Sequence, residues 1–160
     1  MTREEYRASF SVWSVMASPL ILSADLRSSA SAEMRACLAD IALNPEVIAV
    51  NQDPAGHAPF LVRQTPARLP VTGPPDIAST VLARPLSHGE VAVVLFNRLE
   101  EAATLGVAFA EVGLPALASA HVRDLWRKQD LGLHTSSFYA TVPAHAAVMV
   151  RLTPSSSLSL

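Results

Sequence analysis

A run of three apolar residues, Leu20-Ile21-Leu22, lies between two segments that have helical periodicity. Consecutive apolar residues without alternation are typical of a parallel strand that is covered on both faces. Such a strand needs hydrogen-bonding neighbours on both sides, because its open edges would otherwise pair with other chains. Only one strand of this kind is predicted in the first part of the chain. That part is therefore predicted to belong to a larger α/β structure.

The segment before this run is predicted to form a helix over residues 3–17. Thr2 and Glu5 have the spacing of a capping box, in which each side chain accepts a hydrogen bond from the other residue's backbone. Apolar residues then recur at helical steps and form one broad stripe. This stripe consists of Tyr6, Phe10, Trp13 and Ala17.

Two further helical segments follow the run. One is predicted over residues 33–43, and a shorter one begins at Pro45 with Asn44 as its N-cap. The polar residues 51–54 end the shorter helix. Helix, buried strand, polar loop and helix is the repeating order of an α/β barrel or a doubly wound sheet.

The second half of the chain has the pattern of an antiparallel sandwich. Six of the twelve prolines lie between Pro54 and Pro75, which predicts a domain junction. Beyond it, residues 91–96 form an apolar run typical of a central strand. Alternating segments follow at intervals of roughly 10 to 15 residues, as in β-sandwiches. They lie at residues 105–109, 138–142 and 148–152.

Composition and charge exclude several kinds of partner. The net charge is −2 and the twelve basic residues are scattered, so no site for nucleic acid is expected. The longest apolar run, residues 91–96, is far too short to cross a membrane, and no membrane partner is expected. Cys37 is the only cysteine, which excludes an internal disulfide and a thiolate metal site.

Two carboxylates stand where chemistry could occur. Asp25 follows the predicted strand, at the end where α/β folds bind ligands, and Asp53 lies in the segment that ends the third helix. A pair of carboxylates about 5 to 10 Å apart is what glycoside hydrolysis requires. Asp25 also fits a structural role as the cap of a loop, and Asp53, next to Pro54, fits one in shaping a turn. We assign neither to catalysis.

Other kinds of site find no support in the sequence. The five histidines are far apart, so no metal ligands are assigned, and no glycine-rich loop predicts a phosphate cofactor. Trp126 follows a predicted strand and either belongs to the sandwich core or stacks on a sugar. Phe10 and Trp13, on the helical stripe, are predicted to be core residues.

Several segments together resemble α-galactosidases of glycoside hydrolase family 27. They are TREEYR (2–7), FSVWSVMASPLIL (10–22), DLR (25–27) and NPEVIAVNQDP (44–54). Three later segments are similar to the C-terminal β-domain of that family, and are individually less specific. These are RPLSHGEVAVVLFNR (84–98), VRDLW (122–126) and PAHAAVMVRLTP (143–154).

The resemblance implies an α/β fragment, the terminal β/α unit of an eight-stranded β/α barrel, followed by an all-β antiparallel sandwich. Residues 1–56 would then be the end of the barrel, with helix 7, strand 8 and helix 8. Residues 57–153 would be the sandwich, and residues 154–160 a flexible tail. The barrel layers that would cover Tyr6, Phe10, Trp13 and residues 20–22 are absent, so the first 50 residues are expected to be poorly ordered.

The family hydrolyses terminal α-galactosides with retention, using two aspartates and no cofactor. The family motifs that carry these aspartates precede the position that matches Thr2, and none of them occurs here. The resemblance therefore implies no catalytic, cofactor-binding or metal-binding residue in this chain, which is expected to be inactive alone. Met1 matches an internal methionine of the family, so a longer protein is expected.

Alternatives remain open at this point. The chain could be the same portion of an α-N-acetylgalactosaminidase, or a non-catalytic β-sandwich that binds carbohydrate, near Trp126 or Tyr139, or that serves in assembly. An α-galactoside is expected as a partner only in the full-length enzyme, for which a homodimer is left open. The family suggests a secreted, vacuolar or lysosomal protein.

Overall fold

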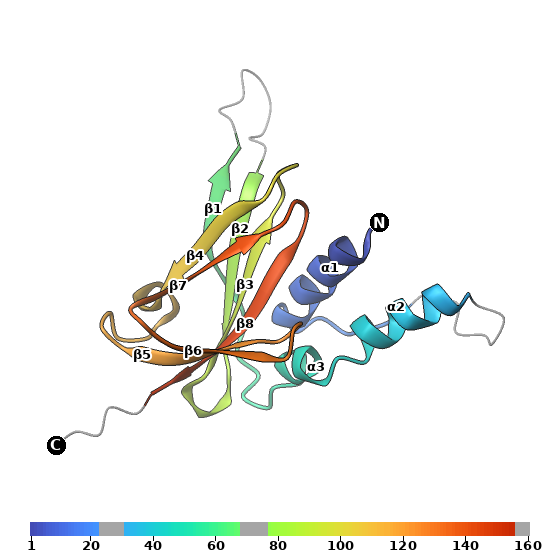
Figure 1. Cartoon of the computed structure of the whole chain (residues 1–160). Coiled ribbons are helices and arrows are strands. Elements are labelled where there is room, and N and C mark those ends of the chain that lie inside the picture. Colours follow the sequence, from blue (N-terminus) through green and yellow to red (C-terminus); the bar gives the residue numbers. More distant parts are fainter. Residues whose placement is uncertain (23–30, 68–76, 156–160) are drawn as a thin grey trace.

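The computed structural model describes residues 1–22, 31–67 and 77–155. Three helices come first in the chain and eight strands follow among these residues (Figure 1). The helices are α1 (Arg3–Val15), α2 (Ala32–Ala42) and α3 (Pro45–Asn51). The strands are β1 (Phe60–Pro66), β2 (Ile77–Pro85), β3 (Val91–Asn97), β4 (Ala103–Ala108), β5 (Ser119–Asp124), β6 (Gln129–Thr135), β7 (Ser137–Val142) and β8 (Ala147–Pro154).

The strands form two antiparallel sheets. The larger has six strands in the order β1-β2-β3-β8-β5-β6, and the smaller pairs β4 with β7. The smaller sheet covers one face of the larger sheet, while α1 and α3 lie on the other side (Figure 1). The predicted antiparallel sandwich is confirmed, with a layer of helices added to it.

The central strand β3 explains why its sequence is apolar throughout. Val93 and Leu95 face the core between the two sheets, whereas Ala92 and Val94 face the core beneath the helices. All four side chains are fully buried. Because both faces of this antiparallel sheet are covered, its central strand has the run of apolar residues that is usual for parallel strands.

The local signals for the helices are confirmed. Thr2 and Glu5 form the reciprocal capping box at the start of α1, and Asn44 caps α3 ahead of Pro45. Helix α2 is longer at its start than predicted by one residue, with Ser31 as its N-cap. It extends away from the rest of the molecule (Figure 1), and Ile41 is its only buried residue.

The predicted strand at residues 20–22 is not formed. The segment has no ladder partner among the described residues, and Ile21 is 73% exposed. A strand is stable only when a neighbour satisfies its backbone groups, and no such neighbour is present in this part of the chain. The apolar character of the segment is therefore not used by the part of the molecule that the structure describes.

Strand β1 lies inside the predicted domain junction. It is an edge strand whose residues are nearly all exposed, so its sequence shows no apolar alternation. Pro59 precedes it and Pro66 is its last residue, and prolines are tolerated at such positions of an edge strand. Strand β6, at the opposite edge, is also mostly exposed and was likewise not predicted.

The expectation that the first 50 residues would be poorly ordered is wrong for α1 and α3. Phe10 is buried, and it packs against the sandwich of this same chain. Tyr6 and Trp13, which share its helical stripe, remain about half exposed. The stripe predicted as core is therefore divided between a covered part and an open part.

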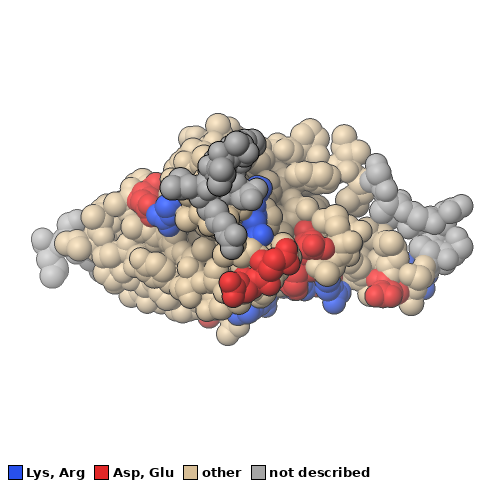
Figure 2. Space-filling model, turned by 90° about the horizontal axis from the view of Figure 1, so that it is seen from above, with Lys and Arg blue, Asp and Glu red and all other residues tan. Residues whose placement is uncertain are grey.

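Charged residues are sparse on much of the surface. Figure 2 shows that most of the face seen from above is formed by uncharged residues, and that its acidic side chains form one larger central group and smaller separate groups, each with basic side chains nearby. No helix in the described part of the chain has the length and apolar character needed to span a membrane.

Candidate functional site

The helical layer is joined to the sandwich by a buried arginine. Strand β2 places Arg84 beneath the end of α3, where it is only 2% exposed. Its Nη1 donates hydrogen bonds to the carbonyls of Val50 (2.7 Å) and Asn51 (3.2 Å), and its Nε donates to His57 O (2.9 Å). The last carbonyls of a helix lack partners within the helix and carry partial negative charge, so a guanidinium suits this position.

The polar segment that ends α3 is structural. Asn51 donates from Nδ2 to Ser18 O at 2.8 Å, which fixes the chain that leaves α1. Asp53 accepts hydrogen bonds from Ser87 N and Ser87 Oγ, all at 3.1 Å, and from Ala55 N at 3.1 Å. The segment therefore connects the helical layer to the turn between β2 and β3.

These hydrogen bonds determine the charge state of Asp53. Partial burial raises the pKa of the carboxyl, but the hydrogen bonds from Ser87 and Ala55 outweigh burial and hold the pKa below its usual value. A carboxylate whose oxygens are committed to two backbone N–H groups and a hydroxyl is suited to closing a turn. Its geometry supports the structural role that the sequence allowed.

The start of α3 is also tied to the sandwich. Asn44 Oδ1 accepts from Glu46 N (3.0 Å) and Val47 N (3.4 Å), while its Nδ2 donates to Leu125 O at 3.0 Å. Glu46 is paired with Arg123 of β5 through two hydrogen bonds of 2.8 and 2.9 Å. Both ends of this seven-residue helix are therefore anchored to strands or to the loops next to them.

The Glu46–Arg123 pair makes stability depend on pH. Hydrogen bonding to Arg123 lowers the pKa of Glu46 from its usual value of 4.5. A lowered pKa in the folded state means that the pair stabilises the fold above pH 4.5 and that this contribution is lost as pH falls through the folded pKa. We expect the melting temperature to decrease below pH 4.5, with a contribution of about 1 kcal/mol from this partly exposed pair.

Thermal unfolding followed by circular dichroism between pH 7 and pH 3 tests this expectation. Glu46→Gln should lower the stability at pH 7 and reduce the pH dependence. The exposed residue Glu101 provides the control Glu101→Gln, which should leave both unchanged. Equal pH profiles for Glu46→Gln and the unaltered chain would contradict the assignment.

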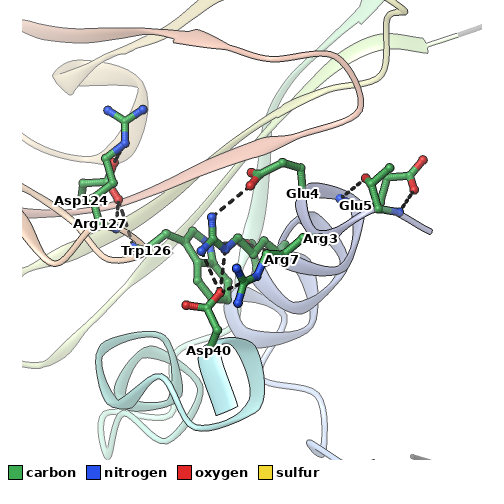
Figure 3. Close-up of polar contacts among 10 residues, drawn as sticks. Arg3, Glu4, Glu5, Arg7, Asp40, Asp124, Trp126 and Arg127 are labelled. Atoms are coloured by element: carbon green, nitrogen blue, oxygen red, sulfur yellow. Dashed lines mark hydrogen bonds and ion pairs between the residues drawn. The ribbon is translucent and has the colours of Figure 1, made fainter. Parts of the chain in front are cut away.

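Trp126 belongs to the helix–sheet contact. Its Nε1 donates to Ser11 Oγ at 2.8 Å, and its ring meets that of Phe10 edge-on with centroids 6.3 Å apart. The guanidinium of Arg7 lies 5.6 Å from the centre of the Trp126 ring (Figure 3). The ring is therefore occupied by protein contacts, and the core interpretation of Trp126 is the one that its contacts favour. Tyr139, in contrast, is 64% exposed.

Arg7 also connects α1 to α2. Its Nη2 lies 2.7 Å and its Nε 3.1 Å from Asp40 Oδ2, and Arg3 Nε lies 3.4 Å from the same oxygen (Figure 3). Arg7 Nη1 contacts Glu4 at 3.0 Å. A single carboxylate of α2 therefore holds this helix beside α1.

An apolar groove lies between α1 and α2. Its volume is 490 Å³. Residues 1–42 supply the whole lining, which includes Tyr6, Phe10, Trp13, Ile21, Leu22, Met34, Leu38 and Ile41. Cys37 lines the same groove as a partly buried free thiol.

A second hollow of 390 Å³ lies beside α1, with Glu5, Trp13, Arg98 and His145 in its lining. A hydrogen bond from His145 Nε2 to Glu100 (3.0 Å) raises the pKa of His145, and the charge of Glu100 acts in the same direction. His145 and Glu100 are therefore paired with each other at the surface.

The candidate catalytic carboxylates are not brought together as a pair by the described residues. Asp25 lies outside these residues, and Asp53 is committed to the turn at Ser87. Within residues 1–22, 31–67 and 77–155, no group of three or more His, Cys, Asp or Glu side chains is placed to hold a metal ion. Arg84, the centre of the observed interface, was not singled out from the sequence. The sequence feature that could have indicated Arg84 is its position as a single charged residue, between Ala83 and Pro85, in an apolar segment.

Two family models match the chain, in the order expected for one enzyme. Residues 1–53 match the model described as alpha galactosidase A, and residues 77–152 match the alpha galactosidase C-terminal beta sandwich domain. A helical segment that matches the first model, followed by a sandwich that matches the second, defines the class of this protein. The class is that of glycoside hydrolases with a C-terminal β-domain.

Curated relatives and solved structures agree with the models. Alpha-galactosidase 3 of Arabidopsis thaliana is 39% identical over 155 residues, which cover 96% of this chain and 32% of that protein. The alpha-galactosidase of Cyamopsis tetragonoloba is 35% identical, with 98% of this chain and 34% of that protein covered. The crystal structure of alpha-galactosidase I from Mortierella vinacea has a TM-score of 0.79 at 27% identity, covering 98% of this chain and 38% of that one.

The chain therefore belongs to the α-galactosidase family, glycoside hydrolase family 27, and corresponds to its C-terminal portion. It spans about a third of the length of the curated relatives that it matches.

Proposed function

We propose that this chain is the C-terminal portion of an α-galactosidase that cleaves terminal α-D-galactosyl residues with retention, and that polypeptide outside these 160 residues supplies both catalytic carboxylates. The observation that carries the proposal is the order of the two family matches, together with the third of the relatives' length that the chain spans. In this proposal the chain contributes the last β/α unit of the enzyme's barrel and the sandwich that follows it.

The assignment of residues 1–56 to the last β/α unit of a barrel is part of this proposal. The match to the alpha galactosidase A model ends at residue 53, where α3 has just ended and the chain turns toward the sandwich. The apolar segment 20–22 has the composition of a barrel strand and lacks neighbours among the described residues. Neighbouring barrel strands would supply the missing hydrogen bonds. Residues 57–153 would then be the sandwich domain. The tail expected over residues 154–160 starts one residue too early, because Pro154 is the last residue of β8.

The isolated chain should not hydrolyse α-galactosides. A retaining glycosidase needs two carboxyl groups only about 5 to 5.5 Å apart, one as nucleophile and one as acid and base. Asp53 has its oxygens occupied by Ser87 and Ala55, and no partner carboxylate is assigned to it.

Incubation of the purified chain with a chromogenic α-galactoside tests this expectation. The rate should equal the background rate, while a full-length relative measured in parallel should release the chromophore. Turnover above background that is lost in Asp53→Asn would contradict the proposal, because the chain would then hold a catalytic carboxylate of its own.

Carbohydrate binding by the sandwich is the second candidate, and one observation favours it. Tyr139 presents an exposed ring on the outer face of β7, and exposed aromatic rings can stack on sugars. Titration with galactose and with galactose-containing oligosaccharides, followed by NMR, would show shifts at Tyr139 if the sandwich is a binding module. A truncation that begins near Pro59 does not separate the two candidates, because it uncovers Val94 and Met149 beneath the helices in either case.

Selection between galactose and N-acetylgalactosamine is outside this chain in the proposal. The residues that contact the 2-substituent of the sugar would lie on barrel loops that precede residue 1. An α-N-acetylgalactosaminidase therefore remains the alternative substrate assignment for the whole enzyme.

A further inference from the structure

The two-stranded sheet of β4 and β7 has one buried face and one exposed face. Its inner face contributes Val107, Phe138 and Val142 to the core between the two sheets. Side chains alternate between the two faces of a strand, so the intervening residues lie on the outer face. They are Thr104, Gly106, Ala108, Ser137, Tyr139 and Thr141. The helices α1 and α3 lie on the far side of the larger sheet, so this outer face is directed away from them (Figure 1).

A tyrosine and a glycine form a platform on this outer face. Gly106 of β4 is paired with Tyr139 of β7. A Cβ atom on Gly106 would collide with Tyr139 Cδ1 and would lie 2.5 Å from Tyr139 Cε1. The ring therefore lies over the backbone of Gly106, in space that a side chain at this position would fill. Gly106 is buried beneath the ring, whereas Tyr139 remains 64% exposed. We call this pair the Tyr139 platform.

The polar groups next to the Tyr139 platform carry no net charge. Arg63 Nη2 donates a hydrogen bond to the glycine carbonyl of the platform at 2.7 Å, and Arg63 Nη1 donates to Glu111 Oε1 at 2.6 Å. These two opposite charges therefore neutralise each other beside β4. Thr104 and Thr141 are paired across the strands, and both are exposed residues with uncharged hydroxyl groups. The surface around the ring is thus polar and neutral.

These features select among the possible classes of ligand. A protein interface has a core of several buried apolar side chains, whereas this face offers a single ring. A nucleotide would stack on the ring, but its phosphate needs a free cation, and Arg63 is already paired with Glu111. A neutral sugar needs only what the face supplies, an aromatic ring for its C–H groups and polar groups for its hydroxyls.

We propose that the Tyr139 platform is a non-covalent binding site for a galactosyl unit of a glycan. The inference rests on the proposed function, which supplies the identity of the sugar, and it names the site at which the sandwich holds that sugar. The axial 4-hydroxyl of galactose leaves three neighbouring C–H groups together on one face, and this apolar face stacks on the Tyr139 ring. Thr104 and Thr141 exchange hydrogen bonds with hydroxyl groups at the rim of the sugar.

The platform is organised before a ligand binds. The ring is held over Gly106 in the free chain, so little conformational entropy is lost when a sugar stacks on it. A glycan with several galactosyl units is kept close to the chain when one unit is held on the ring, and the local concentration of its other units rises. No bond is formed or broken at the platform.

Protection of the glycine is the competing explanation for the position of the ring. Aromatic side chains cover glycines at sheet edges and stabilise the strand pair. That role depends on contact between the ring and Gly106, and it is indifferent to sugar. Both explanations predict some loss of stability for Tyr139→Ala, so only a measurement of sugar binding separates them.

NMR titration of the full 160-residue chain with methyl α-D-galactopyranoside is the test, and methyl α-D-glucopyranoside is the comparison ligand. The galactoside should shift the signals of the Tyr139 ring protons and of the Gly106 amide, with a dissociation constant of about 1 to 10 mM, as expected for a ligand of this size. The glucoside has an equatorial 4-hydroxyl, which divides the same C–H groups between both faces of the sugar. It should therefore bind several-fold more weakly.

Matched variants locate the site. Tyr139→Ala removes the ring and should weaken binding about tenfold, whereas Tyr139→Phe keeps the ring and should change the affinity by less than about threefold. Gly106→Ala leaves the tyrosine in the chain but puts a Cβ atom where the ring lies, so it should weaken binding by displacing the ring. Leu133→Ala removes an apolar side chain of β6 that is 55% exposed, and it should leave the affinity unchanged.

Each outcome decides a distinct statement. Absence of shifts at Tyr139, at galactoside concentrations far above the expected dissociation constant, overturns the inference, and so does an unchanged affinity in Tyr139→Ala. If circular dichroism shows that Tyr139→Ala does not fold, the affinity of Gly106→Ala decides the same point. Equal binding of the glucoside overturns the assignment to a galactosyl unit. Hydrolysis of a chromogenic α-galactoside by the isolated chain contradicts the proposed function alone, because binding at the platform is measured without turnover.

Discussion

Replacement of Arg84 by methionine is expected to lower the free energy of unfolding by about 3 kcal/mol. The substitution removes the donors for three carbonyls, those of Val50, Asn51 and His57. The hydrogen bonds to Val50 and Asn51 are buried, and each buried carbonyl left without a donor costs about 1 to 3 kcal/mol, whereas the partly buried carbonyl of His57 can bind water instead. Relief from burying the guanidinium, which is 2% exposed, offsets part of that loss. Methionine preserves most of the volume, so the effect reports hydrogen bonding more than packing.

Denaturant unfolding monitored by circular dichroism provides the measurement. Arg84→Lys keeps the charge, but a single ammonium group cannot reproduce the guanidinium fork, which donates from Nη1 and Nε to different carbonyls. An intermediate loss of stability is therefore expected. Arg98→Met, at an exposed position directly after β3, is the matched control and should change stability by less than 1 kcal/mol. A loss in Arg84→Met no larger than in Arg98→Met would show that the carbonyls find other partners.

The local signals in the sequence were sufficient for the helices. The capping box at Thr2 and the proline after Asn44 located the starts of α1 and α3, because caps depend on neighbouring residues only. The antiparallel sandwich followed from alternation in the strands that have one buried face. Signals of this kind are local, and they survive in a chain whatever its distant contacts are.

Signals that depend on distant neighbours were read less well. Residues 20–22 have a strand-like sequence, but a strand is completed by its partners, which the described residues do not supply. Strands β1 and β6 were not predicted because an exposed edge strand needs no apolar alternation. In both cases the local sequence describes the strand itself, whereas the neighbouring strand with which it pairs decides whether it forms.

The candidate site shows the same limit. The sequence leaves two interpretations open for Asp53 and for Trp126, because the partners that favour one of them, Ser87 and Ser11, are distant in sequence. The sequence does not predict that Arg84 is buried, because an arginine in a strand usually points to solvent. Only the fold shows that α3 ends above it.

Replacement of Asn44 by alanine should cost about 2 to 4 kcal/mol, because this side chain acts in two directions. Loss of the N-cap removes the acceptor for Glu46 N and Val47 N, which is worth about 1 kcal/mol. Loss of Nδ2 leaves the buried carbonyl of Leu125 without this donor, which costs about 1 to 3 kcal/mol more.

Ser31→Ala is the matched control for the Asn44 variant. Ser31 also caps a helix, through a single hydrogen bond to Met34 N at 3.1 Å, but it is exposed and makes no contact of this kind with the sandwich. Its loss should be about 0.5 to 1 kcal/mol. Asn44→Ser, which can keep the cap but cannot reach Leu125, should fall between the two. Equal losses for Asn44→Ala and Ser31→Ala in thermal unfolding would mean that Asn44 is only a cap and that the helical layer is not held to the sandwich through it.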